Sequence, residues 1–363
     1  MILPETYVVA LFLAIFAAIC WGSWANTYKL AGRQRFELFY WDYALGVLLA
    51  AILAAFTFGS LGFNVAGGGG GFAFMDDLML HASKHSWVYG MAAGAVFNLG
   101  TILLVGAMSL AGMSLAFPVG LGLAAVVALL LASIDRPHVN AVLLLSTLVL
   151  ILAAVVLDGL AYRAAARRRS QEAIKTGRTK STKVTVSWKG IVLALVGGPL
   201  VGLCFPLIDL SRTPDTGMGP YAAAVMFAVG ALVSTFAYNL LLMNLPIRGE
   251  PIEVLQYLRQ PKKSHLLPLL GGMVWAAGTV SLFVASSAVA ATTNQQAEPL
   301  PLLGPNTAIL VILAAALLSG LWGLFVWKEL ADASARARSL TALALVMLLA
   351  SLALFLAVPP FTA

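Results

Sequence analysis

Charged residues are scarce in this sequence. Only 10% of its 363 residues are Asp, Glu, Lys or Arg, whereas about 25% is usual in a soluble domain. Hydrophobic residues make up 61%. This composition argues against a water-soluble fold and indicates an integral membrane protein that crosses the bilayer several times.

Reactive and metal-binding side chains are equally few. The two cysteines, Cys20 and Cys204, both fall inside apolar segments and support no disulfide. His81 and His85 are four residues apart but lack the further ligands that a metal site needs. No set of residues forms a catalytic pattern, so we expect no enzyme, no metal and no cofactor.

Long apolar runs, in contrast, are abundant. A helix needs about 20 apolar residues to cross the roughly 30 Å hydrocarbon core, where no water can satisfy its backbone. We predict an all-α integral membrane protein with ten transmembrane helices. Their expected positions are residues 6–28, 40–61, 87–110, 112–133, 138–160, 189–210, 219–243, 266–290, 305–327 and 339–359.

The positive charges are distributed asymmetrically. Of the 22 Lys and Arg residues, all but Lys84, Arg136 and Arg212 lie in loops that follow the odd-numbered spans. The positive-inside rule then places these loops in the cytoplasm, with both termini outside a cytoplasmic (inner) membrane. The net charge of +7 follows from this topology, and no nucleic-acid partner is needed to explain it.

A weak internal repeat divides the chain into halves. "GAVFNLGT" (94–101) recurs as "GMVWAAGT" (272–279), and "AICWGSW" (18–24) faintly matches "VGLCFPL" (201–207) at a similar offset. Because five is odd, a repeated unit of five spans would be inverted in the membrane, as in many transporters. We predict repeats at 1–162 and 189–363, joined by a basic cytoplasmic linker at 163–188.

Two spans carry polar residues at membrane depth. Asn98 and Thr101 share a face of the third span with small residues, and Trp275 and Thr279 share a face of the eighth. The residues of the third span form either a closely packed helix contact, with Asn98 bonded to a neighbour, or the wall of a substrate cavity. We select all four as candidate substrate-binding residues.

The end of the first span combines aromatic and polar residues. Trp21 and Tyr28 are interpreted mainly as interfacial anchors, because such rings gather at the membrane surface. Ser23, Trp24 and Asn26 lie a turn or more inside that boundary, so we predict that they line the substrate path.

The triplet "GSW" (22–24) is followed by "YWDYALGVLLAAILAAFTFGSLG" (40–62), and "GLWGLFVWKE" (320–329) ends the ninth span. These segments resemble plant ureide permeases of the drug/metabolite transporter (DMT) superfamily. "GMVWAAGT" is more distantly similar to bacterial glucose and rhamnose uptake proteins. The positions that match the family pattern are Ser23, Trp24, Asp42, Tyr43, Gly100 and Glu329.

This resemblance implies the DMT fold, a central cavity and transport of a small, neutral, polar solute. Nitrogen heterocycles such as allantoin, uracil or a purine base would be the substrates. A sugar uptake carrier and a multidrug or metabolite exporter stay open as alternatives, because the segment 291–307 is longer than the family pattern. The oligomeric state is also open.

The resemblance raises proton coupling as well. Asp42, near the start of the second span, is the leading candidate for a proton carrier, and Asp209 is the second. The competing interpretation of Asp42 is a salt bridge to Lys29 or to a basic loop residue. The predicted partners are therefore a small-molecule substrate, the lipid bilayer and protons.

Overall fold

A computed structural model describes residues 1–4, 6–32, 34–61, 73–134, 140–175, 188–213, 215–287, 289–291, 297–299 and 306–357. These residues include ten helices long and apolar enough to cross a membrane, which confirms the predicted number of spans. The spanning helices are α1 (Tyr7–Ser23) continued by α2 (Asn26–Leu30), α3 (Phe36–Phe56), α5 (Lys84–Ala111), α6 (Met113–Ile134), α7 (Ala141–Lys175), α8 (Lys189–Ser211), α9 (Pro220–Asn244), α11 (Lys263–Ala285), α12 (Asn306–Leu321) and α13 (Ala335–Ala357).

Shorter elements lie between the spans, except η2, which forms the end of the ninth span. They are α4 (Phe74–Asp76), η1 (Asp77–His81), α10 (Val254–Leu258), β1 (Val289–Ala291), β2 (Ala297–Pro299) and η2 (Trp322–Val326), the two η elements being π-helical. β1 and β2 pair antiparallel. They fall in the long segment after the eighth span, of which residues 292–296 and 300–305 lie outside the described part of the chain.

Local sequence determines several helix ends. The Ser83 hydroxyl caps α5 by accepting a hydrogen bond from the Ser86 backbone N–H at 3.1 Å. Pro220 is the first residue of α9, where its missing N–H costs nothing. Gly112 has a φ of +94° between α5 and α6, so the chain reverses sharply there in a conformation that suits glycine.

Helix α7 is longer than the sequence pattern predicts. The predicted span ends at residue 160, whereas the helix continues to Lys175. Alanine, arginine and glutamate favour helix, and Arg168 pairs with Glu172 one turn later at 2.8 Å. The first part of the predicted linker is therefore helical, and residues 176–187 lie outside the described part of the chain.

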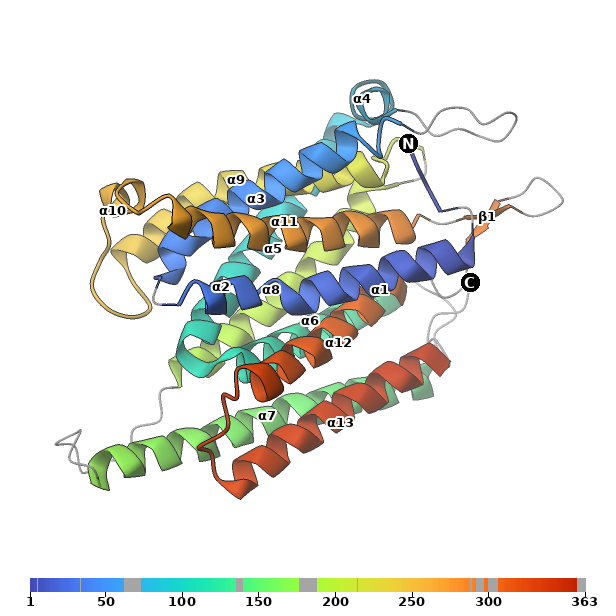
Figure 1. The fold of residues 1–363 in the computed structure, drawn as a ribbon. Coiled ribbons are helices and arrows are strands. Elements are labelled where there is room, and N and C mark those ends of the chain that lie inside the picture. Colours follow the sequence, from blue (N-terminus) through green and yellow to red (C-terminus); the bar gives the residue numbers. More distant parts are fainter. Residues whose placement is uncertain are drawn as a thin grey trace.

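The spans form a bundle with one peripheral pair (Figure 1). Helix α5 packs on α8 and α9, α3 packs on α9 and α11, and α6 packs on α8 and α12. Helix α1 contacts α11 and α12, while α7 and α13 pack along each other at one side of the bundle. α1 begins and α13 ends at the same end of the bundle.

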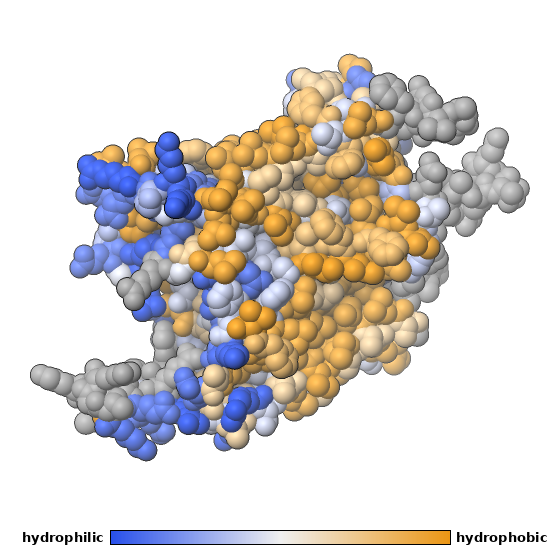
Figure 2. Space-filling view, in the orientation of Figure 1, coloured by the Kyte–Doolittle hydropathy of each residue, from blue (hydrophilic) through white to orange (hydrophobic). Residues whose placement is uncertain are grey.

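The two ends of the bundle differ in polarity. Figure 2 shows apolar side chains over most of the visible face and hydrophilic ones gathered at one end, over α2, α10 and the last turns of α7. We call this the basic end, since it carries Lys29, Arg35, Arg248 and Arg259. The opposite end carries η1 and the start of α9. Exposed apolar side chains along the spans are the expected contact with lipid tails, so this is an integral membrane protein.

Candidate functional site

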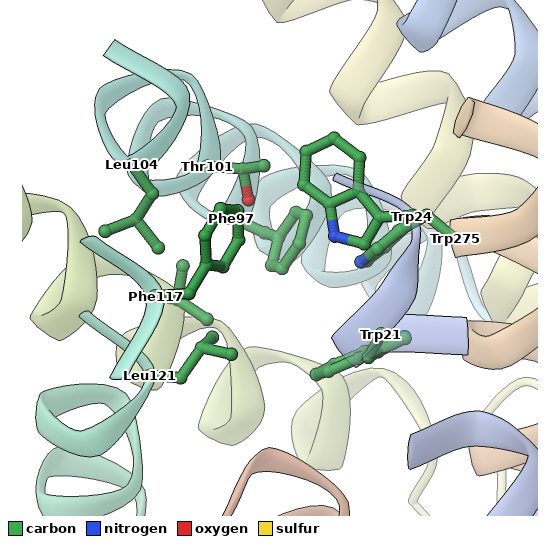
Figure 3. A pocket seen from close by; sticks show the side chains of 9 residues that line it. Trp21, Trp24, Phe97, Thr101, Leu104, Phe117, Leu121 and Trp275 are labelled. Carbon is green, nitrogen blue, oxygen red and sulfur yellow. The ribbon is translucent and has the colours of Figure 1, made fainter. Parts of the chain in front are cut away.

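A small cavity lies in the centre of the bundle, between α1, α5, α6, α8 and α11 (Figure 3). Its volume is about 20 Å³, enough for about one water molecule. None of the lining side chains is charged. They are Trp21, Trp24, Phe97, Thr101, Leu104, Phe117, Leu121, Val201 and Trp275.

Stacked aromatic rings form the walls of this cavity. Trp21 and Trp275 stack with their ring centroids 5.6 Å apart and an interplanar angle of 18°. Phe97 lies 4.5 Å from Trp275, and Trp24 meets Phe117 edge-on at 5.8 Å. These contacts join helices from both halves of the chain, and their flat faces offer stacking area to a planar ligand.

Thr279 orients one of these rings. Its hydroxyl accepts a hydrogen bond from the Trp21 indole N–H at 3.1 Å and donates to the Trp275 carbonyl, also at 3.1 Å. Thr279 thus lies behind the two stacked indoles and does not line the cavity itself. Trp24, Thr101 and Trp275, which the sequence also predicts, all line it.

Asn98 lies away from the cavity in a polar joint between α3, α5 and α9. Its side-chain amide donates to the hydroxyls of Ser234 at 2.8 Å and Thr235 at 3.1 Å. Its carbonyl oxygen accepts from the Tyr40 hydroxyl at 2.9 Å. Asn98 is 2% exposed, and both the NH₂ group and the oxygen of its amide form hydrogen bonds within the protein.

Ser23 and Asn26 face α12 and η2. The Ser23 hydroxyl accepts from the Trp322 indole N–H at 3.0 Å, and the Asn26 side-chain oxygen accepts from that of Trp327 at 2.6 Å. Both contacts fall at the break between α1 and α2 and at the π-helical end of the ninth span. They hold two helix irregularities against each other.

Asp42 is buried at the basic end. One of its carboxylate oxygens accepts from the Tyr257 hydroxyl at 2.5 Å, and the other lies 2.7 Å from His265 Nδ1. The carboxylate thus ties α3 to α10 and to the start of α11. Burial raises the pKa of Tyr257, and the bond to Asp42 raises it further. Of the partners that the competing interpretation offers for Asp42, Lys29 or a basic loop residue, Lys29 pairs with another carboxylate.

That partner is Glu329, just after η2. Its carboxylate pairs with the Lys29 ammonium and accepts 2.8 Å hydrogen bonds from the backbone N–H groups of Met113 and Ser114, at the start of α6. A carboxylate is favoured there by the helix dipole. Burial alone would raise the pKa of Glu329, but Lys29 and the two N–H groups bring it below its ordinary value.

A larger cavity opens at the basic end, and we call it the basic vestibule. Its volume is about 480 Å³, within the usual range of small-molecule pockets. Three of the side chains around it are cationic. The lining residues are Tyr28, Lys29, Gly32, Gln34, Arg35, Phe36, Met108, Ser109, Arg248 and Gly249.

Arg212 ties the opposite end together. Its guanidinium donates to the Ser286 hydroxyl at 2.9 Å, to the Phe283 carbonyl at 3.3 Å and to the Ser287 hydroxyl. These bonds join the end of α8 to the end of α11. Burial lowers the pKa of Arg212 to about 10, against the opposing effect of the nearby carboxylates, Asp209 among them. Asp209 itself is exposed on the last turns of α8.

Sequence reasoning missed several of the residues that shape the site. The interpretation of Trp21 as an interfacial anchor is wrong, since its ring is 5% exposed and lines the central cavity. Phe97 could have been found, because it occupies the position in "GAVFNLGT" that Trp275 occupies in "GMVWAAGT". Tyr257 and His265 carried no local signal that links them to Asp42.

Two comparisons with known proteins found similarities to this chain. Residues 39–193 match the family model described as ureide permease. No curated protein sequence matches the chain. A solved structure titled only "Crystal structure of protein" shares the fold with a TM-score of 0.52 and 15% identity, covering 96% of both chains. The chain is thus an integral membrane protein in which residues 39–193 are similar to the ureide permease family.

Proposed function

We propose that the protein is a secondary transporter that moves a small, neutral, polar solute across the membrane by alternating access. A nitrogen heterocycle, such as allantoin, uracil or a purine base, is the proposed substrate class. The observation that carries this proposal is the central cavity, which is walled by aromatic rings from both halves of the chain. The permease description of the matching family favours a transporter over an enzyme.

The chemistry of the cavity supports an uncharged, planar ligand. The rings of Trp21, Trp24 and Trp275 supply stacking surface, and Thr101 supplies a hydroxyl. A fully charged ligand would have to leave water without a countercharge among the lining residues, which is costly at this depth. Trp24, Thr101 and Trp275 are therefore proposed to contact substrate directly, while Ser23, Asn26, Asn98 and Thr279 support the site from behind.

We propose further that residues 1–162 and 189–363 are inverted repeats joined by 163–188. The packing of the spans supports this. The proposed repeat pairs the first span with the sixth, the second with the seventh, and so on. In helix labels, α1 is exchanged with α8, α3 with α9, α5 with α11, α6 with α12 and α7 with α13. This exchange converts the α5–α8 contact into the α1–α11 contact, and the α6–α8 contact into the α1–α12 contact. The pairs α3–α9, α6–α12 and α7–α13 convert into themselves. A pseudo-twofold axis predicts this pattern.

Backbone contacts follow the same exchange. Between α5 and α9, a Cβ at Gly94 would overlap the Phe227 carbonyl, and a Cβ at Gly230 would overlap the Met91 carbonyl. The two helices therefore touch backbone to backbone at two reciprocal glycines.

The pair α3–α11 repeats this arrangement. A Cβ at Gly272 would overlap the Tyr43 carbonyl, and a Cβ at Gly46 would overlap the Leu269 carbonyl. Gly94 and Gly272 are the first residues of the two repeated octapeptides. Reciprocal glycine contacts at matching positions support a common origin of the two halves.

Alternating access requires a closure on each side of the site. The Lys29–Glu329 pair closes the basic end and Arg212 closes the opposite end. We propose that the basic end faces the cytoplasm and that both termini face outward, because positive charge is retained on the cytoplasmic side. The protein then rests in an occluded state with a vestibule on its inner side.

Proton coupling is assigned to Asp42, with Asp209 as the second candidate. Asp42 is 4% exposed and bridges α10 and α11, so a change in its charge would alter how these elements are held together. We expect Asp42→Asn to abolish uptake driven by a pH gradient while leaving substrate exchange intact. The exposed Asp215 supplies the control Asp215→Asn. Full pH-driven uptake by Asp42→Asn would refute this proposal. Asp209→Asn would then be measured in the same assay.

The proposed function is tested by a thermal-shift screen of the purified protein against allantoin, uracil, xanthine, several hexoses and pentoses, and quaternary-amine drugs. Stabilisation by heterocycles alone supports the proposal. Stabilisation by sugars alone would make the protein a glucose- or rhamnose-type carrier, and by drugs alone an exporter. Counterflow in proteoliposomes then separates mechanisms, since preloaded ligand accelerates uptake of label through a carrier but not through a channel.

A further inference from the structure

Two tyrosines of α3 differ in how their hydroxyls are satisfied. Tyr40 and Tyr43 lie one turn apart, and both are at most 2% exposed. The Tyr40 hydroxyl donates to the Asn98 side-chain oxygen at 2.9 Å. The Tyr43 hydroxyl is buried and has no hydrogen-bond partner among the described residues. A buried hydroxyl without a partner is costly, so its presence calls for an explanation.

Tyr43 stands between the two cavities. Its ring lies 4.6 Å from that of Trp24, which lines the central cavity. On its other side it stacks on Phe39 at 6.3 Å, and Phe39 meets Tyr28 edge-on at 5.2 Å. Tyr28 lines the basic vestibule. This row of four rings runs from the central cavity to the vestibule.

A planar heterocycle needs more room than the central cavity has. A volume of about 20 Å³ holds about one water, so at least one lining ring must move before a ligand enters. Trp24 is the ring best placed to do so, because it follows the last residue of α1 at the break before α2. Movement of Trp24 would uncover the Tyr43 ring, against which it packs.

We propose that Tyr43 is a substrate-binding residue whose hydroxyl donates a hydrogen bond to the ligand. The compound it recognises is a planar, uncharged one that carries a carbonyl oxygen or an unprotonated ring nitrogen. This inference rests on the proposed function and adds a specificity-determining contact to the same site. It also explains the unpartnered hydroxyl, which is satisfied by the ligand in the loaded protein.

The experiment compares Tyr43→Phe with Tyr40→Phe, which removes the matched hydroxyl one turn away. Melting temperature without ligand is measured first. Tyr40→Phe should melt lower, because Asn98 loses a partner. Tyr43→Phe should melt at or above the wild-type temperature, because no bond is lost. A lower melting temperature for Tyr43→Phe, equal to that of Tyr40→Phe, would show that its hydroxyl is already satisfied and would overturn the inference.

Binding is measured next, with uracil and allantoin as probes. The Kd of Tyr43→Phe should rise roughly tenfold or more, as expected when a ligand acceptor loses its donor, whereas Tyr40→Phe should bind like the wild type. An unchanged Kd for Tyr43→Phe would refute the contact while leaving the proposed function intact. Failure of the wild type to bind either probe would instead count against the proposed substrate class, and the melting comparison would still decide whether the hydroxyl is free.

Discussion

Partly buried charges of opposite sign tie the two ends of the bundle. At the basic end the Glu329 carboxylate holds Lys29 and the start of α6, whereas at the opposite end the Arg212 guanidinium holds the neutral hydroxyls of Ser286 and Ser287. A carboxylate loses its charge in acid, but a guanidinium keeps its charge throughout that range. The contact at the basic end therefore depends on ionisation, and the contact at the opposite end depends on the planar, branched arrangement of the guanidinium N–H donors. The two closures that we propose can thus respond to different conditions.

The largest effect is expected from Glu329→Gln. The variant leaves the Lys29 ammonium without its carboxylate and weakens the cap on α6. Loss of this partly buried ion pair, together with weaker hydrogen bonds from two backbone N–H groups, should cost about 3 kcal/mol, to be measured as the free energy of unfolding in detergent micelles. The control is Glu172→Gln, which breaks the exposed pair with Arg168. This change should cost only a few tenths of a kcal/mol. Equal losses in the two variants would contradict a special role for Glu329.

A smaller effect is expected from Arg212→Lys. Lysine keeps the positive charge but cannot reach all three acceptors with one ammonium group, so hydrogen bonds worth about 2 kcal/mol should be lost. The matched control is Arg259→Lys on the exposed α10 surface. If Arg212→Lys retained wild-type stability, charge alone would close this end and the contrast with the basic end would disappear.

The smallest effects concern pH, and they should have opposite signs at the two ends. Because the pKa of folded Glu329 lies below its ordinary value, its contribution to stability is present above about pH 4.5 and is lost as pH falls through the lower folded value. At the opposite end, burial raises the pKa of Asp77. The hydrogen bond from the Gly219 N–H and the nearby cations lower this pKa, but burial has the larger effect. Protonation of Asp77 in acid therefore removes the free-energy cost of burying its charge and adds to the stability of the folded protein.

Melting temperatures between about pH 7 and pH 3.5 would show this difference. Glu329→Gln should lose less stability on acidification than the wild type, and Asp77→Asn should lose more. Should both substitutions alter the acid response in the same direction, the assignment of opposite signs to the two ends would be wrong.

Most of the fold could be predicted from sequence because membrane spans are encoded by length and apolarity alone. The predicted and observed starts of the sixth span agree at residue 189, and α9 starts within a residue of its prediction. The end of α7 could not be found in this way, because its last turns leave the apolar segment and rely on helix propensity and on the pair Arg168–Glu172.

The site was only partly accessible to sequence reasoning. Helical periodicity selects Thr101 and Trp275, because residues three or four positions apart in the sequence lie on the same face of a helix. The partners of Asn98 on α9 are 136 and 137 residues away, and those of Asp42 are more than 200 away. Contacts between helices that far apart depend on the assembled bundle, and no local pattern encodes them.

The near absence of free space in the central cavity has a consequence for the membrane as a whole. Protons and ions cross bilayers along continuous files of water, and a space for about one water beside a row of packed rings cannot hold such a file. The protein without substrate therefore conducts neither protons nor ions through this cavity. A membrane can therefore hold many copies of the protein without losing its electrochemical gradient through them.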